Sequence, residues 1–130
     1  MRYGPAAQVV VAAVFGVFTL ALGLWAFFDT SSFYDEIATF PPYNRHLLHD
    51  VGAFQIGLGV ALIAAIVWRG DALLAVLAGA GAGATLHWVA HVVDEGHGGR
   101  SSDPYALGII AAIVVVAAVW RWADRTWGRR

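Results

Sequence analysis

The chain has 130 residues, of which 59% are hydrophobic and only 13% are charged, and its formal net charge is −1. A soluble domain usually has about 45–50% apolar and about 25% charged residues. This composition therefore excludes an ordinary water-soluble domain and requires lipid to cover part of the surface. The chain has no cysteine, which excludes disulfides, thiolate metal sites and iron–sulfur clusters. A chain of this length is expected to form one domain over 1–130.

Four apolar stretches follow one another, each close to the ~20 residues that cross a bilayer as a helix. We predict transmembrane helices over 8–28, 46–68, 72–93 and 104–122, and hence an all-α, integral membrane four-helix bundle. The first stretch is too long for the apolar part of a signal peptide and no cleavage site follows it, so we expect it to be retained. Pro41-Pro42 interrupts the polar connection over 29–44. Arg69-Gly70-Asp71 predicts a tight turn, which makes the second and third helices an antiparallel hairpin.

The charged residues are divided unevenly between the two ends of this bundle, and the chain has no lysine. Six arginines fall at the end that carries both termini and two at the other: Arg2, Arg69, Arg121, Arg125, Arg129 and Arg130 against Arg45 and Arg100. The positive-inside rule therefore predicts a multi-pass protein of the plasma membrane with both termini cytoplasmic. The outer face receives seven of the nine acidic residues. Such a surface attracts cations, unless the acids are merely solvated loop residues.

All five histidines fall on the outer side. His46 and Asp50 are four residues apart at the start of the second helix, and His87 and His91 are four apart at the end of the third. Residues three or four apart share a helix face, so each helix aims one pair in one direction. Because the two helices form a hairpin, their outer ends are expected to meet, with the pairs facing each other.

Small residues continue the line of the second histidine pair. Gly79 and Gly83 precede His87 and His91 in steps of four. Membrane helices approach one another closely where small residues recur at this spacing. We therefore expect Gly79 and Gly83 to be close-contact positions and the histidine faces to be buried between helices.

Three imidazoles and one carboxylate at these spacings match a site for Zn²⁺, Fe²⁺, Cu²⁺ or a similar transition-metal ion. The predicted metal ligands are His46, Asp50, His87 and His91. Three neighbours would complete the site or hold the second ring nitrogen of a ligand, namely Asn44, His49 and Asp94. A haem ligated by His46 and either His87 or His91 also satisfies the histidine count. His97 lies in a glycine-rich loop and is expected to be solvated.

Other roles for the same residues stay open. Buried His–Asp pairs can lock helices together through hydrogen bonds without any metal, and ionisable groups near membrane helices also handle protons or bind polar ligands. The basic, tryptophan-rich segment over 121–130 indicates an interfacial anchor near anionic lipid, and its short length argues against nucleic-acid recognition.

The run PYNRHLLHDVGAFQIGLGV, followed by LHWVAHVVDEGHGG and SDPYALG, resembles a group of small four-helix membrane proteins of actinobacterial type that are similar to DoxX-like proteins. The resemblance covers 43–108. Its two patterns, N-x-H-L-x-x-D-x-G and H-x-x-x-H-x-x-D, match Asn44, His46, Leu47, Asp50 and Gly52, and then His87, His91 and Asp94. His49 and His97 lie outside both. The resemblance implies a membrane-embedded polar site and an association with quinone-linked redox membrane complexes.

These observations predict a small integral membrane metalloprotein whose site lies at the outer face, with redox or hydrolytic chemistry. Whether the chain is an enzyme stays open. One alternative is an accessory subunit of a membrane redox complex that binds quinone, haem or protons, with a complex or a second copy of the chain as its partner. A metal transporter is the other alternative, but the spans are almost entirely apolar below Asp50 and His87.

Overall fold

The computed structural model describes residues 4–68 and 70–127. Four long helices make up most of the fold: α1 (Gly4–Phe28), α3 (Arg45–Trp68), α4 (Gly70–Val93) and α5 (Asp103–Trp127). All four are long and apolar enough to cross a membrane. The described ranges contain no strand. The predicted all-α class and four spans are therefore confirmed, and the chain is built as a multi-pass membrane protein.

Two helical segments were not expected from the apolar pattern. The short helix α2 (Thr30–Glu36) lies in the connection predicted as a loop, where the Asp29 carboxylate accepts a hydrogen bond from the Ser32 backbone N–H at 3.2 Å and caps it. At the other end of the chain, α5 continues five residues past the predicted limit of 122. Its last turns are polar, but Asp124 accepts a hydrogen bond from the Gln8 amide at 2.8 Å and Arg125 pairs with Asp71.

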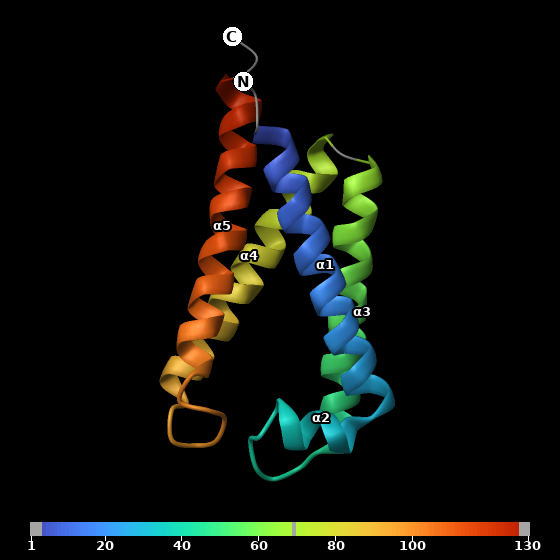
Figure 1. The fold of residues 1–130 in the computed structure, drawn as a ribbon, viewed down its shortest axis with the longest axis vertical. Coiled ribbons are helices and arrows are strands. Elements are labelled where there is room, and N and C mark those ends of the chain that lie inside the picture. The colour runs from blue at the N-terminus through green and yellow to red at the C-terminus, as the bar shows by residue number, and fades with distance from the viewer. Residues whose placement is uncertain (1–3, 69, 128–130) are drawn as a thin grey trace.

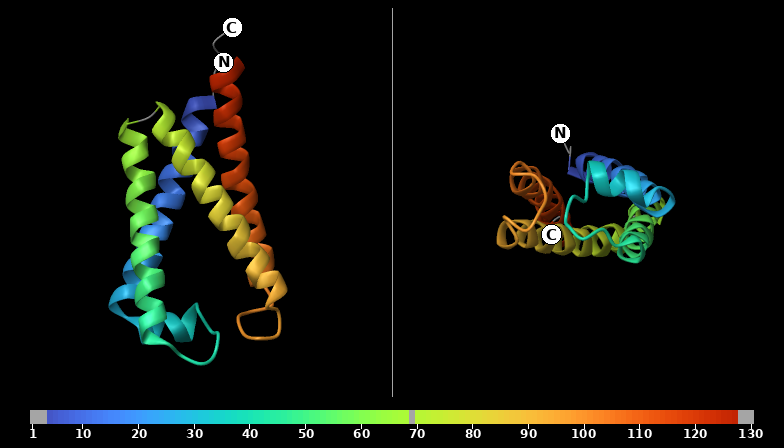
Figure 2. Two further views of the ribbon diagram at one scale, coloured as in Figure 1. Left: turned by 180° about the vertical axis from the view of Figure 1, so that it is seen from behind. Right: turned by 90° about the horizontal axis from the view of Figure 1, so that it is seen from below.

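The four long helices associate two by two. Figure 1 shows α1 lying along α3 and α4 lying along α5, and these are the most extensive helix contacts in the fold. The two pairs meet at the end where α1 starts and α5 stops, which we call the terminal end. They diverge toward the opposite end, which carries the connections over 29–44 and 94–102 and which we call the histidine end. The view from behind in Figure 2 shows the same divergence.

Side chains from all four long helices form one core in the half of the molecule toward the terminal end. Ala12 of α1, Leu62 of α3, Leu77 of α4 and Val114 of α5 are all at most 1% exposed there. Toward the histidine end this shared core gives way to a smaller cluster in which Ala26, Phe33 and Leu48 pack α2 against α1 and α3. The two helix pairs are thus joined mainly at one end.

Glycines bring the backbones of α1 and α3 into direct contact. A Cβ atom on Gly23 would lie 2.6 Å from the Ile56 backbone nitrogen, and one on Gly59 would lie 2.8 Å from the Gly16 carbonyl oxygen. Gly52 is equally close to the backbone of α1, with the Phe27 nitrogen at 2.8 Å. Small residues allow such close packing of membrane helices. At these three positions, no side chain larger than hydrogen fits unless the backbone moves.

The expectation that Gly79 and Gly83 are close-contact positions is wrong. A Cβ atom on either residue would meet nothing within 4 Å. The face of α4 that packs on α5 instead carries Gly81, whose Cβ would lie 3.2 Å from Val115 Cγ2, and Trp88, which covers Gly108. This glycine-rich segment offers small residues on several faces, and the packing partner decides which of them is used.

Replacing a seam glycine should destabilise the fold. Gly59→Ala is expected to lower the free energy of unfolding by about 1–3 kcal/mol, because backbone atoms of α1 cannot move away as a flexible side chain would. The measurement is denaturant unfolding of the detergent-solubilised protein, followed by circular dichroism. Gly79→Ala is the matched control and should leave stability unchanged or slightly raised. Equal loss of stability in the two variants would contradict the seam.

Candidate functional site

The first polar pair lies on the exterior of the α1–α3 pair. Asn44 caps α3, since its side-chain oxygen accepts a hydrogen bond from the Leu47 backbone N–H at 3.0 Å. One turn further, His46 Nε2 lies 3.6 Å from Asp50 Oδ2, and these side chains are 87% and 53% exposed. The His49 ring packs on Phe27 with 5.1 Å between ring centroids. This end of α3 therefore presents its polar groups to the surroundings.

In the second pair, His91 is enclosed whereas His87 is exposed. The rings of His87 and His91 lie edge to face, with centroids 4.9 Å apart. His91 Nδ1 is 3.8 Å from the Asp103 carboxylate, which stands at the start of α5, and the His91 side chain is only 17% exposed. The edge of the Phe40 ring packs against the same imidazole at 5.2 Å. Three segments, α4, α5 and the connection after α2, thus surround His91.

The connections at the histidine end touch each other and bridge the two helix pairs. The Gly99 backbone N–H donates to the Thr39 carbonyl oxygen at 3.1 Å. The Arg100 guanidinium donates to the Glu36 carbonyl oxygen at 2.6 Å and lies 3.9 Å from the Glu36 carboxylate. Gly99 has a φ of +76°, a conformation that glycine adopts readily. The loop can therefore lie directly against the connection that follows α2.

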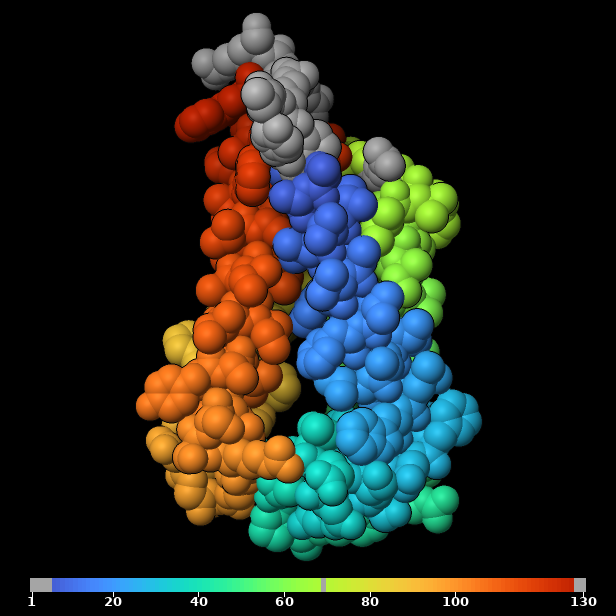
Figure 3. Space-filling view, in the orientation of Figure 1, coloured from blue at the N-terminus to red at the C-terminus, as the bar shows by residue number. Residues whose placement is uncertain are grey.

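A hollow lies behind this bridge, between the diverging helix pairs. Figure 3 shows it as an opening bordered by α1 on one side and by α4 and α5 on the other, with the segment around α2 below. Phe40 approaches His91 from the opposite helix pair, so the face of α4 that carries His91 is turned toward this space. His87 lies one helical turn deeper on the same face. His91 therefore lies on the side of α4 that meets the connection from the other helix pair.

The structure keeps the two predicted pairs apart. The glycine seam holds α3 against α1, and α4 belongs to the other helix pair, so their ends separate at the histidine end (Figure 2). Within residues 4–68 and 70–127, no three histidine, aspartate or glutamate side chains are grouped to hold a metal ion. The four-ligand site of His46, Asp50, His87 and His91 stays a prediction. The same holds for its expected helpers, Asn44, His49 and Asp94.

Sequence reasoning missed Asp103 and Phe40 as neighbours of His91. A signal for the role of Asp103 was present. In an antiparallel hairpin, the last turn of one helix faces the first turn of the next, which places Asp103 opposite His91. Phe40 had no such signal, because its contact with His91 depends on how the connection after α2 folds back toward α5.

The unequal exposure of the histidines should appear in their chemical reactivity. With diethyl pyrocarbonate, His46 should be modified faster than His91, by roughly the fivefold ratio of their exposed fractions of 87% and 17%. Mass spectrometry of the digested, detergent-solubilised protein would give the two rates. Phe40→Ala should accelerate modification of His91 and leave that of His46 unchanged. Equal rates at His46 and His91 in the unaltered protein would contradict the arrangement.

Comparison of the chain with family models, with curated proteins and with solved structures finds no match. The likeness to DoxX-like proteins therefore stays an expectation from the two sequence patterns.

Proposed function

We propose that the chain is a small integral membrane protein that binds a divalent transition-metal ion, Zn²⁺, Fe²⁺ or Cu²⁺, through His87 and His91 near the histidine end of α4. The observation that carries the proposal is the imidazole pair on consecutive turns of α4, with 4.9 Å between ring centroids. Two imidazole nitrogens that can turn toward one point form a chelate, and all three ions accept imidazole.

Asp103 supports this role for His91. Metal-binding histidines commonly direct their other ring nitrogen to a carboxylate, which fixes the ring and makes the ligating nitrogen more basic. The Asp103 carboxylate lies 3.8 Å from His91 Nδ1, which leaves Nε2 free for a ligand. Two protein ligands leave coordination positions for water or a substrate, as a catalytic or exchangeable metal site requires.

The other predicted roles are weaker fits to this geometry. A haem with two axial histidines needs them on opposite sides of the iron, whereas His87 and His91 share one helix face and His46 projects from the other helix pair. A transporter needs polar groups along the span, and the four spans are apolar along most of their length. An accessory subunit that handles protons would use the same three groups, Asp103, His91 and His87, without a metal.

Metal binding can be tested by calorimetric Zn²⁺ titration of the detergent-solubilised protein, purified without a histidine tag. We expect His87→Ala and His91→Ala each to abolish the main binding event. Asp103→Asn should weaken the affinity by about 10–100-fold, because it affects a ligand without removing one. His46→Ala is the matched control: it removes an exposed histidine of another i,i+4 pair and should leave affinity unchanged.

Two outcomes would redirect the proposal. If His46→Ala and Asp50→Ala weaken binding as much as His87→Ala, the four-ligand site is right and α3 must approach α4 in the metal-bound state. If the unaltered protein binds neither Zn²⁺, Cu²⁺ nor Fe²⁺, the metal role fails and the proton-handling role takes its place.

We also propose that the terminal end faces the cytoplasm and the histidine end the outside of the plasma membrane. The six-to-two distribution of arginines supports this orientation. A green fluorescent protein fused after the C-terminus should fluoresce, whereas alkaline phosphatase at the same position should be inactive. An active phosphatase fusion would reverse the orientation and place the histidines inside.

A further inference from the structure

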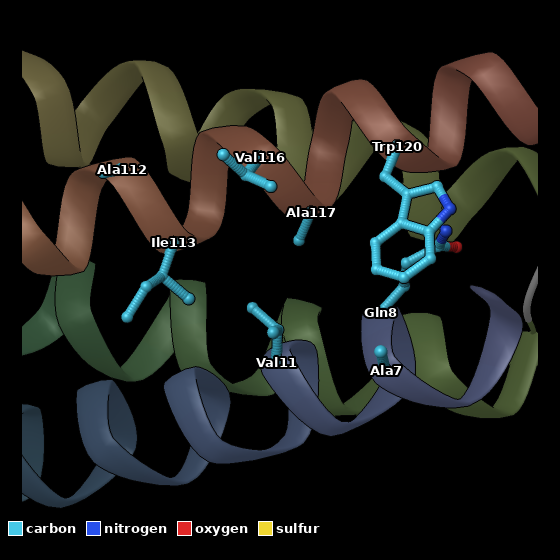
Figure 4. Close-up of a pocket in the computed structure, with 8 residues that line it drawn as sticks. All are labelled: Ala7, Gln8, Val11, Ala112, Ile113, Val116, Ala117 and Trp120. Atoms are coloured by element: carbon cyan, nitrogen blue, oxygen red, sulfur yellow. The ribbon is translucent and has the colours of Figure 1, made fainter. Parts of the chain in front are cut away.

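A groove runs between α1 and α5 in the half of the molecule toward the terminal end, away from the histidines. Figure 4 shows its lining, with Gln8 and Val11 on α1 and Ile113, Val116 and Trp120 on α5. Its volume is about 300 Å³, which is at the small end of the range for ligand sites. Apart from the Gln8 amide and the indole N–H, the named lining side chains are apolar.

Gln8 brings an unused hydrogen-bond acceptor to this groove. The residue is only 1% exposed, and its amide nitrogen donates to the Asp124 carboxylate at 2.8 Å. Reversing the amide would place its carbonyl against that carboxylate, so the orientation is fixed. The amide oxygen is buried and has no hydrogen-bond partner among the described residues. A buried acceptor without a donor is unfavourable, above all within a membrane.

The surface of the groove is almost wholly apolar, and the two lining residues that carry polar groups lie at one end. Gln8 and Trp120 lie at its end nearest the terminal end of the molecule, and Ile113 lies about 10 Å deeper along α5. A ligand that fits this gradient has a hydrogen-bond donor near the membrane boundary and an apolar tail that points toward the bilayer centre. Asp124 stands beside Gln8 and would repel an anionic head group. The donor is therefore expected on a neutral group.

We propose that the groove between α1 and α5 binds a neutral lipid with a free hydroxyl group, which donates to Gln8 Oε1. The lipid tail would lie along Val11, Val116 and Ile113. Figure 4 shows the Trp120 ring beside the Gln8 amide, and this residue is 43% exposed. Because the amide oxygen is covered, the indole ring must turn outward to admit the hydroxyl group. This site is independent of the metal proposal, since it lies at the other end of the molecule.

The test uses an alcohol and its methyl ether, which share a tail but differ in the donor. The protein is placed in phosphatidylcholine vesicles, which carry no free hydroxyl, and titrated with 5,6-dibromodecan-1-ol or the ether. Bromine quenches tryptophan fluorescence on contact. The signal is the difference in quenching between the unaltered protein and Trp120→Phe. This difference excludes the quenching of the other tryptophans. The alcohol should quench at about five- to tenfold lower concentration than the ether, as one hydrogen bond predicts.

Two variants distinguish the contribution of the hydrogen bond from the contribution of the groove to lipid binding. Gln8→Met should erase the difference between alcohol and ether. Because this change also removes the bond to Asp124, folding is checked by circular dichroism. Ala112→Phe keeps Gln8 and fills the groove from an exposed position, so it should weaken quenching by both probes. Equal quenching by alcohol and ether in the unaltered protein, or undiminished quenching by both probes in Ala112→Phe, would overturn the proposal.

Discussion

The close approach of α1 to α3 is the contact on which the rest of the structure depends. Gly16 and Gly23 on one helix meet Gly59 and Gly52 on the other, so backbone rests on backbone along much of the seam. Because α3 is packed so closely on α1, it cannot also pack along the whole length of α4, the next helix in the chain. Although α4 begins directly after the connection from α3, it packs along α5 and meets α3 mainly near that connection. The hollow and the enclosed position of His91 both follow from this pairing.

The sequence predicts the spans well because an apolar run is a property of one segment alone. It predicts pairing poorly because pairing depends on which of several small-residue faces finds a partner. The stripe through Gly79 and Gly83 has the usual spacing for helix contact, yet the structure uses Gly52 and Gly59, which are seven residues apart. Similarly, α2 was missed because it forms around the Asp29 cap and the burial of Phe33, and neither produces a periodic apolar pattern.

In the candidate site too, the sequence predicts what lies within one helix but not what depends on packing between helices. Spacing alone predicts that His87 and His91 act together, and their rings are in contact. The partner of the pair depends on tertiary structure, so Asp103 and Phe40 replace His46 and Asp50 as neighbours. Gln8 illustrates a different limit. Near the start of a long apolar helix, one glutamine gives no signal in the sequence, and its significance comes from a buried oxygen that only the packing shows.

The bridge between the connections has a mechanical consequence. At the histidine end, the ties between the helix pairs described above are the Thr39–Gly99 hydrogen bond, the Arg100–Glu36 contacts and the ring contact of Phe40 with His91. At the terminal end, a shared core and the Gln8–Asp124 hydrogen bond join them. The two helix pairs are therefore joined firmly at the terminal end, where Leu62, Leu77 and Val114 belong to the shared core, and only weakly at the histidine end. Breaking these few surface contacts would let the two helix pairs separate at the histidine end without unfolding any helix, so access to the enclosed His91 is expected to depend on how often the contacts break.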